Sequence, residues 1–385
     1  MTIAADRTEA LMALFTREGY RRVEPAVLQP VDVFLDLSGE DIRRRMFVTQ
    51  DAAGNELCLR PDYTIPVSRD YLASVESGSP AAYSYLGPVF RLRAGETGEF
   101  PQAGIESFGR EDREAADAEI LALGIEAVTS LGLSDMTVKL GDVAILTRLL
   151  AALDLPALTQ RRVLRAVVQG RAEAALAEDD AAGEPRTGAD HAGLLAAIEG
   201  QDPKAAHAFV EDVLSIAGIS KVGGRTAGEI AERFLARAAA RNGAISAEMR
   251  AVIGRYLAIS GDPDTAAVAL RALARDAALD LDAAIDSFEA RTGFMAARGI
   301  DVASLSFSAG FARNLDYYTG FIFEVIDPHR PHLKPIVGGG RYDGLLTHLG
   351  APQPIPAVGC SIWLDRLGLR SAMAAPAPAN PGDAS

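Results

Sequence analysis

RNLDYYTG at residues 313–320 and GGGRYDGL at residues 338–345 are the most specific segments of this 385-residue chain. Tyr317 and Tyr318 offer a ring for packing and phenol groups for hydrogen bonding. Arg313 supplies a cation for a carboxylate or a phosphate. The glycine triplet lacks the Lys-Ser or Lys-Thr ending of a nucleotide-binding P-loop, so it gives little support for a phosphate site. The two segments together favour a site for a small ligand.

Segments nearer the N-terminus add complementary polar groups: LRPDYT at residues 59–64 and FPQAGIE at residues 100–106. If residues 59–64 are extended, Asp62 and Thr64 point to the same face and can accept hydrogen bonds from an ammonium group. Gln102 and Glu106 are four apart, which places them on one face of a strand. Glu106 can then accept an imidazole N–H, and Gln102 can contact an amine. Histidine presents this combination of an amine, a carboxylate and a two-nitrogen ring.

Each of these residues, taken singly, has a simpler structural interpretation. A lone Asp62 or Glu106 is more often a structural ion-pair partner than a ligand contact. Two adjacent tyrosines are more often core or turn residues, and a glycine triplet is a tight-packing element in many proteins. The order of the segments along the chain is therefore what favours a binding site.

Composition narrows the class of protein. Hydrophobic residues make up 49% of the chain, but no apolar run is long enough to span a bilayer. The net charge of −14 argues against a large nucleic-acid footprint, which would need a basic face. Cys58 and Cys360 lie in hydrophobic segments, as expected of buried thiols in a reducing compartment. The five histidines show no ligand spacing with cysteine, so we predict no bound metal. The N-terminal residues lack the pattern of a signal peptide, and we predict a cytoplasmic protein without a cofactor.

Hydrophobic periodicity predicts strands towards both ends of the chain and helices between them. Helices are expected over residues 3–18 and 117–131, and a hairpin over residues 46–59. Strands are expected over residues 23–28 (interrupted by Pro25), 82–93, 103–108, 304–308, 321–326 and 357–362. Strands that neighbour each other through hairpins favour an antiparallel sheet in an α+β fold.

The middle of the chain changes character. Residues 146–299 are rich in alanine, with leucine at helical spacing, and predict an inserted all-helical domain. A polar break at residues 178–188 is interpreted as a mobile loop. The core domain is expected to be discontinuous, comprising residues 1–145 and 300–372, and the Ala/Pro-rich tail at residues 373–385 is expected to be disordered.

In this order the motifs resemble the catalytic domain of histidyl-tRNA synthetase over roughly residues 5–145 and 300–370. GPVFR at residues 87–91 is similar to the start of class II motif 2, and VGCSIWLDRL at residues 358–367 to motif 3. Pro25 stands where motif 1, the dimerisation motif, has its proline. The resemblance implies a class II synthetase-like antiparallel sheet flanked by helices. It assigns histidine contacts to Asp62, Thr64, Gln102, Glu106, Arg313, Tyr317, Tyr318 and Tyr342.

The chain departs from the synthetases in the segment that handles ATP, which here reads RLRAGETGEF at residues 91–100. Arg93 replaces a glutamate, the loop is about three residues shorter, and Glu96 and Gly98 stand where loop arginines are expected. Acidic side chains near the three phosphates of ATP would repel them. Activation of an amino acid instead needs cations placed against the charge that develops on the α-phosphate. Arg91 and Arg366 remain as residual ATP-site arginines, or as structural residues. About twenty residues follow Arg366, so no anticodon-binding domain is expected.

A histidine pocket without ATP handling resembles the family of regulatory subunits of ATP phosphoribosyltransferase. The resemblance implies a non-catalytic subunit that activates a short catalytic subunit in the first step of L-histidine biosynthesis and transmits feedback inhibition by histidine. It also implies a homodimer core within a hetero-oligomer. Two alternatives stay open: a truncated ligase that forms histidyl-adenylate, supported by Arg91, Arg313 and Arg366, and a tRNA-binding sensor that uses the helical insert. Arg313 can serve the carboxylate of histidine or be a remnant of the ATP site.

Overall fold

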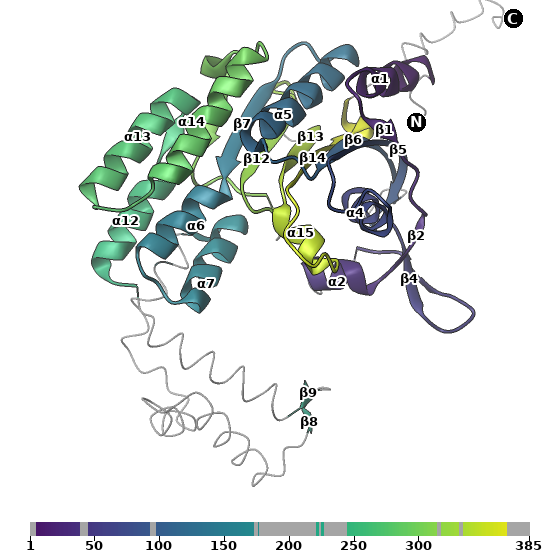
Figure 1. The fold of residues 1–385 in the computed structure, drawn as a ribbon, viewed down its shortest axis with the longest axis horizontal. Helices are drawn as coiled ribbons and strands as arrows, with labels where there is room; N and C mark the ends of the chain where they lie inside the picture. Colours follow the sequence, from purple (N-terminus) through teal and green to yellow (C-terminus); the bar gives the residue numbers. More distant parts are fainter. Residues whose placement is uncertain are drawn as a thin grey trace, which may run out of the picture.

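The structure of the protein is a computed structural model. It describes residues 5–38, 45–92, 98–172, 176, 221–222, 225–226, 245–313, 317–330 and 334–367. Within these ranges the main element is a nine-stranded sheet of order β1-β5-β6-β14-β13-β12-β7-β11-β10 (Figure 1). In that order the strands are Arg21–Arg22, Ala81–Phe90, Glu99–Phe108, Ala357–Trp363, Val337–Arg341, Phe321–Ile326, Thr137–Asp142, Ser306–Ser308 and Ser260–Gly261.

The sheet is antiparallel through its centre, as the α+β prediction requires. Every pair from β5 to β7 is antiparallel, and only the β1–β5 and β11–β7 pairs are parallel. β14, from the C-terminal part of the chain, lies between β6 and β13. The two ends of the chain therefore build one sheet, and the predicted class II synthetase-like architecture is confirmed.

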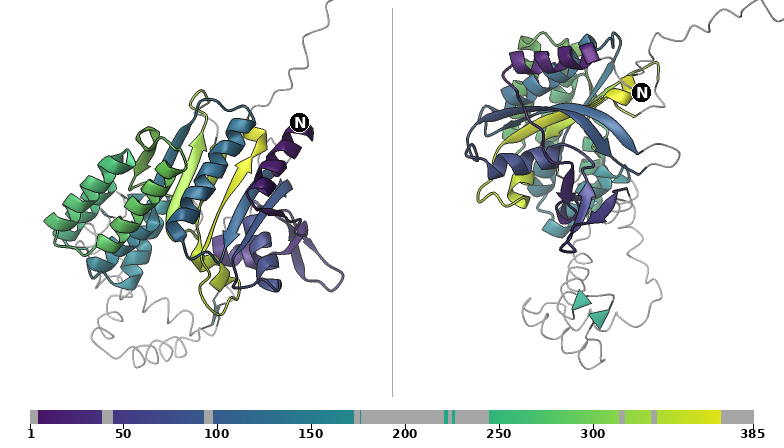
Figure 2. Two further views of the ribbon diagram at one scale, coloured as in Figure 1. Left: turned by 45° about the horizontal axis from the view of Figure 1, so that its top comes forward. Right: turned by 90° about the vertical axis from the view of Figure 1, so that its right-hand side faces the viewer.

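Each face of the sheet is covered by a hydrophobic cluster. On one face lie α1 (Ala5–Arg17) and α5 (Arg113–Ser130), with Phe15 and Leu121 fully buried. On the other lie α4 (Thr64–Ala73) and α15 (Asp343–His348), which pack with the tyrosines of β5. Figure 2 shows α1 and α4 on opposite sides of the sheet. Alternation of side chains along β5 and β6 supplies both clusters, because successive residues of a strand point to opposite faces.

Helices from the middle of the chain pack into the same cluster as α1 and α5. They are α6 (Val143–Ala152), α7 (Ala157–Val168), α12 (Ala247–Leu257), α13 (Pro263–Asp276) and α14 (Asp282–Ala297). The range predicted to be all-helical also contains strands: β10 pairs with β11 in the main sheet, and β8 (Lys221–Val222) pairs with β9 (Arg225–Thr226). The division into a core and an inserted domain remains a prediction, and the predicted loop at 178–188 and tail at 373–385 lie outside the described residues.

A second, three-stranded sheet contains the predicted hairpin. β3 (Val48–Gln50) and β4 (Glu56–Leu59) form it, and β2 (Leu28–Pro30) pairs with β4. The predicted strand over residues 23–28 is wrong, because β1 ends at Arg22 and β2 begins at Leu28. The carbonyl of Pro25 accepts a hydrogen bond from Arg60 Nη1 at 2.5 Å instead of joining a strand ladder. The remaining short elements are α2 (Asp32–Ser38), the 3₁₀ turn Val302–Ser304 and the 3₁₀ turn Leu364–Leu367.

Across the described ranges, none of the helices has both the length and the apolarity needed to cross a membrane.

Candidate functional site

A small cavity lies on the sheet face that α4 and α15 cover. The structure brings together most of the residues predicted for the ligand site. The lining residues are Asp62, Thr64, Arg91, Gln102, Arg313, Tyr317, Tyr318, Gly338, Tyr342, Gly359, Cys360, Ser361 and Trp363. Two predicted residues are not in the lining: Glu106 bonds to lining residues from a buried position, and Arg366 stacks on Trp363.

Strand register explains how distant segments meet at the cavity. Glu106 pairs with Gly359 across β6 and β14, and Gln102 pairs with Trp363 four residues along. Because alternate residues of a strand share a face, Gln102 and Glu106 point to the same side of the sheet. Glycine opposite Glu106 leaves room for its carboxylate, since a Cβ on Gly359 would lie 1.6 Å from Glu106 Oε2.

Glu106 is fully buried and receives three hydrogen bonds. Thr64 Oγ1 donates to Oε1 at 2.8 Å, the Tyr85 hydroxyl donates to Oε1 at 3.2 Å, and the Tyr342 hydroxyl donates to Oε2. Burial raises the pKa of Glu106 to about 7, and these three hydrogen bonds act in the opposite direction. A carboxyl poised near neutrality can accept an N–H from an imidazole or give up its proton as a charged ligand enters.

Asp62 and Thr64 both line the cavity, but not for the predicted reason. Residues 59–64 are not one extended stretch, because Thr64 is the first residue of α4. Asp62 Oδ1 accepts a hydrogen bond from the backbone N–H of Ile65 at 3.2 Å, which satisfies a free donor at the helix start. Burial raises the pKa of Asp62, and Arg91 opposes the effect. Helix geometry, not strand alternation, therefore brings this carboxylate and hydroxyl to one cavity.

Gln102 and Arg313 carry buried polar atoms that no protein group satisfies within the described ranges. The side chain of Gln102 is 1% exposed, and neither its Oε1 nor its Nε2 has a hydrogen-bond partner there. Arg313 Nη1 pairs with Glu324 Oε1 at 2.7 Å and donates to the carbonyl of Phe323 at 3.4 Å, but its Nε has no such partner. Unmet buried polar groups cost about 1–3 kcal/mol each, so a bound ligand that met them would be favoured.

The tyrosines predicted for the site form its aromatic wall. The ring centroids of Tyr317 and Tyr318 lie 4.9 Å apart, and those of Tyr317 and Tyr342 lie 5.9 Å apart in an edge-on arrangement. Burial raises the pKa of all three phenols, so each keeps its proton and can donate a hydrogen bond. An aromatic wall of this kind suits a planar ring such as imidazole.

The two residual ATP-site arginines both bond to the protein itself. Arg91 Nε donates to the carbonyl of Pro61 at 2.6 Å. Arg366 Nη1 donates to the carbonyl of Pro335, and its guanidinium carbon lies 4.3 Å from the centroid of the Trp363 ring. The residues at 93 and 96 that mark the altered ATP loop lie outside the described residues.

Sequence reasoning missed several residues at the site. Tyr85 bonds Glu106, Ser361 and Trp363 line the cavity, and Gly338 makes room for Arg313. The lining positions 359, 361 and 363 alternate along β14, so strand periodicity within the motif 3 segment contained this signal.

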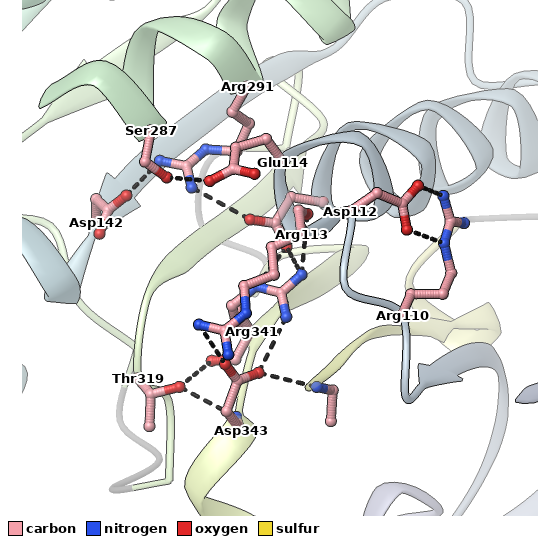
Figure 3. Close-up of polar contacts among 12 residues, drawn as sticks. Arg110, Asp112, Arg113, Glu114, Asp142, Ser287, Arg291, Thr319, Arg341 and Asp343 are labelled. Carbon is pink, nitrogen blue, oxygen red and sulfur yellow. Dashed lines mark hydrogen bonds and ion pairs between the residues drawn. The ribbon is translucent and has the colours of Figure 1, made fainter. Parts of the chain in front are cut away.

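A buried ion-pair network anchors the GGGRYDGL segment (Figure 3). Arg341 donates through Nε and Nη2 to Asp117 Oδ1 at 2.9 and 2.6 Å, and through Nη1 to Asp343 at 3.0 Å. Arg291 on α14 pairs with the other oxygen of Asp117 at 3.2 Å and with Asp142. Because Tyr342 lies between Arg341 and Asp343, this network holds the phenol that bonds Glu106.

Comparisons with known proteins identify the relatives of this chain. The family model described as histidyl-tRNA synthetase matches residues 3–215 and 206–367. A protein of Mesorhizobium japonicum named ATP phosphoribosyltransferase regulatory subunit is 42% identical over 368 residues, which cover 95% of this chain and 96% of that protein. A protein of the same name from Brucella melitensis biotype 1 is 40% identical over 373 residues, covering 95% and 98%.

Solved structures show the same fold. The crystal structure of an ATP phosphoribosyltransferase regulatory subunit/histidyl-tRNA synthetase from Bacillus halodurans aligns with a TM-score of 0.66 at 21% identity, covering 94% of this chain and 77% of that one. The histidine–tRNA ligase subunit of Alicyclobacillus acidocaldarius aligns with a TM-score of 0.54 at 25% identity, covering 95% and 94%.

Proposed function

The chain belongs to the histidyl-tRNA synthetase family and, within it, to the ATP phosphoribosyltransferase regulatory subunits, and on that basis we propose that it is a non-catalytic subunit that senses L-histidine. It activates the short catalytic subunit of ATP phosphoribosyltransferase, in the first step of histidine biosynthesis, and transmits feedback inhibition when histidine fills the cavity. We further propose that it works in the cytoplasm, as a homodimer core within a hetero-oligomer.

The match between the cavity and histidine supports this proposal. Glu106 and the tyrosine wall suit the imidazole, whose ring nitrogens need a polar partner and whose faces pack on aromatic groups. Asp62 and Gln102 offer acceptors for the ammonium group, and Arg313 offers a cation for the carboxylate.

The position of Arg366 supports a non-catalytic role. Activation of an amino acid needs cations placed against the charge that develops on the α-phosphate of ATP. Arg366 stacks on Trp363, donates to the carbonyl of Pro335 and is absent from the cavity lining, whereas Arg91 lines the cavity and donates through Nε to the carbonyl of Pro61. Regulation then requires that histidine bind one assembly state better than another, because that difference in affinity is the coupling free energy.

Co-purification with a short catalytic subunit, assayed with and without histidine, tests the proposal. We expect the catalytic subunit to be active only in the complex, and histidine to inhibit it. Glu106→Ala is expected to weaken histidine binding and relieve inhibition while the complex still forms. Glu289→Ala, on the exposed side of α14, is the matched control for losing a carboxylate and should leave inhibition intact. Unchanged histidine affinity of Glu106→Ala by calorimetry would contradict the site assignment.

One observation favours a second candidate, a ligase that forms histidyl-adenylate. Arg313 lines the cavity with its guanidinium group, which could contact either a carboxylate or a phosphate. Histidine-dependent exchange of pyrophosphate into ATP by the purified chain distinguishes the two. Robust exchange would support the ligase, and its absence together with histidine binding would support the regulatory subunit. A mobility shift with deacylated tRNA at physiological salt tests the remaining alternative of a tRNA-binding sensor.

A further inference from the structure

Trp363 is an unassigned donor at the wall of the cavity. It is the last residue of β14, the single tryptophan of the chain, and 8% exposed. Its indole Nε1 is buried and meets no acceptor in the part of the chain that the structure describes. A buried indole N–H usually finds a hydrogen-bond partner, so this one calls for an acceptor other than the groups of the described residues.

Arg313 presents a second such donor beside the indole. Its guanidinium carbon lies 5.9 Å from the centroid of the Trp363 ring. Nη1 of Arg313 pairs with Glu324, whereas Nε of Arg313 is buried and has no acceptor within the described ranges. Two unmet N–H groups on adjacent side chains select a ligand group that only accepts hydrogen bonds. An ionised carboxylate is such a group, and it is also attracted by the positive charge of Arg313.

The position of Trp363 along the sheet indicates how the ligand is oriented in the cavity. Trp363 pairs with Gln102, whereas Glu106 lies four residues away on the same strand. Four residues of a strand span about 13 Å, so the indole and Glu106 mark two separate ends of the site. The Arg366 guanidinium, 4.3 Å from the ring centroid, and its bond to the carbonyl of Pro335 help fix the indole plane.

We propose that the indole Nε1–H of Trp363 donates a hydrogen bond to the α-carboxylate of the amino acid, beside the guanidinium group of Arg313 to which the proposed function already assigns that carboxylate. This inference rests on the proposed function, because it assumes that the ligand is histidine. It makes Trp363 a specificity-determining residue, since an imidazole ligand without a carboxylate leaves the indole donor unmet.

A comparison of two ligands on two proteins tests the proposal. Calorimetry of the full chain should show that L-histidine binds more tightly than histamine, which lacks the carboxylate. Trp363→Phe keeps a ring beside Arg366 but removes the N–H, so its histidine affinity should fall about tenfold, as expected when a hydrogen bond to a charged group is lost. Its histamine affinity should stay unchanged. Tyr20→Phe removes a buried hydroxyl that bonds Glu119 on the other face of the sheet and should alter neither affinity.

Fluorescence of the single tryptophan provides a second measurement on the unaltered chain. Saturation with histidine should shift or quench the emission, and histamine should change it much less. Binding of histidine without any change in emission would overturn the inference. So would an equal loss of histidine and histamine affinity in Trp363→Phe, or no loss at all. If the wild-type chain binds no histidine by calorimetry, it is the proposed function that fails.

Discussion

Glu106 and Gly359 face each other across β6 and β14, and the carboxylate of Glu106 fills the space that a side chain at position 359 would need. A Cβ on Gly359 would lie 1.6 Å from Glu106 Oε2 and 2.6 Å from the carbonyl oxygen of Ile105. The absence of a side chain at Gly359 therefore allows a carboxyl to be buried in the sheet and still bond Thr64 and Tyr342, which line the cavity. The same relationship recurs at Gly338, which makes room for Arg313.

Gly338→Ala should damage the site more than the fold. A Cβ there would lie 2.0 Å from Arg313 Nη1, the end of a flexible side chain, so Arg313 can move away and lose its pairing with Glu324. We expect histidine affinity to fall tenfold or more by calorimetry, with an unfolding free energy lowered by about 1–3 kcal/mol. Gly293→Ala on α14, where a Cβ meets nothing within 4 Å, should leave binding unchanged. Undiminished histidine binding by Gly338→Ala would show that the position of Arg313 does not matter.

Glu106 should make the folded state less stable as the pH rises. Burial raises its pKa from 4.5 in the unfolded chain to about 7 in the fold. Between these values the folded state binds more protons than the unfolded state, so stability is full below about pH 4.5 and is lost as the pH rises through about 7. The loss amounts to about 3 kcal/mol. Glu106→Gln should remove this pH-dependent loss of stability. Denaturant titrations of the wild-type and Glu106→Gln proteins at pH 4.5 and pH 8 measure the difference. Parallel stability curves for the two proteins would exclude a raised pKa.

Arg291 should be among the most costly charged residues to remove. Its side chain is 5% exposed and pairs with Asp117 and Asp142, which are 2% and 5% exposed (Figure 3). Arg291→Ala leaves buried carboxylates without a counter-charge, so we expect the free energy of unfolding to fall by about 3–5 kcal/mol. Arg271→Ala removes an arginine whose carboxylate partners are largely exposed, and should cost less than about 1 kcal/mol. Equal losses in urea titrations would contradict the distinction.

Neither cysteine should react in the folded protein. Burial raises the pKa of Cys58 to about 12, and burial together with the charge of Glu106 raises the pKa of Cys360 further. The thiolate is the reactive form, so both thiols are expected to be inert at pH 8 and to react fully in denaturant. Quantitative titration with a chromogenic disulfide tests this. Fast labelling of Cys360 in the native state would show that the cavity opens to reagent.

Local patterns in the sequence predicted many of the helices and strands. Alternation and helical spacing predicted α5 and the strands β5, β12 and β14 within a few residues of their observed ends. The same patterns did not predict β7, a strand of only six residues, several of which are polar. They also failed for residues 23–28, where Pro25 interrupts the chain and its carbonyl bonds a side chain from a distant segment. Short strands depend on their neighbours for hydrogen bonds, so they leave little local signal.

The sequence by itself determined the ligand chemistry that we propose, because the types and order of Asp62, Gln102, Glu106 and Tyr318 indicate which groups the proposed ligand would contact. The tertiary structure decided which of these groups meet and how. Glu106 bonds Tyr342 across a separation of 236 residues, and its raised pKa comes from burial that no local pattern reports. Register alone places Trp363 opposite Gln102. Long-range strand pairing and desolvation arise only when distant segments pack together, so they are properties of the fold and not of any single motif.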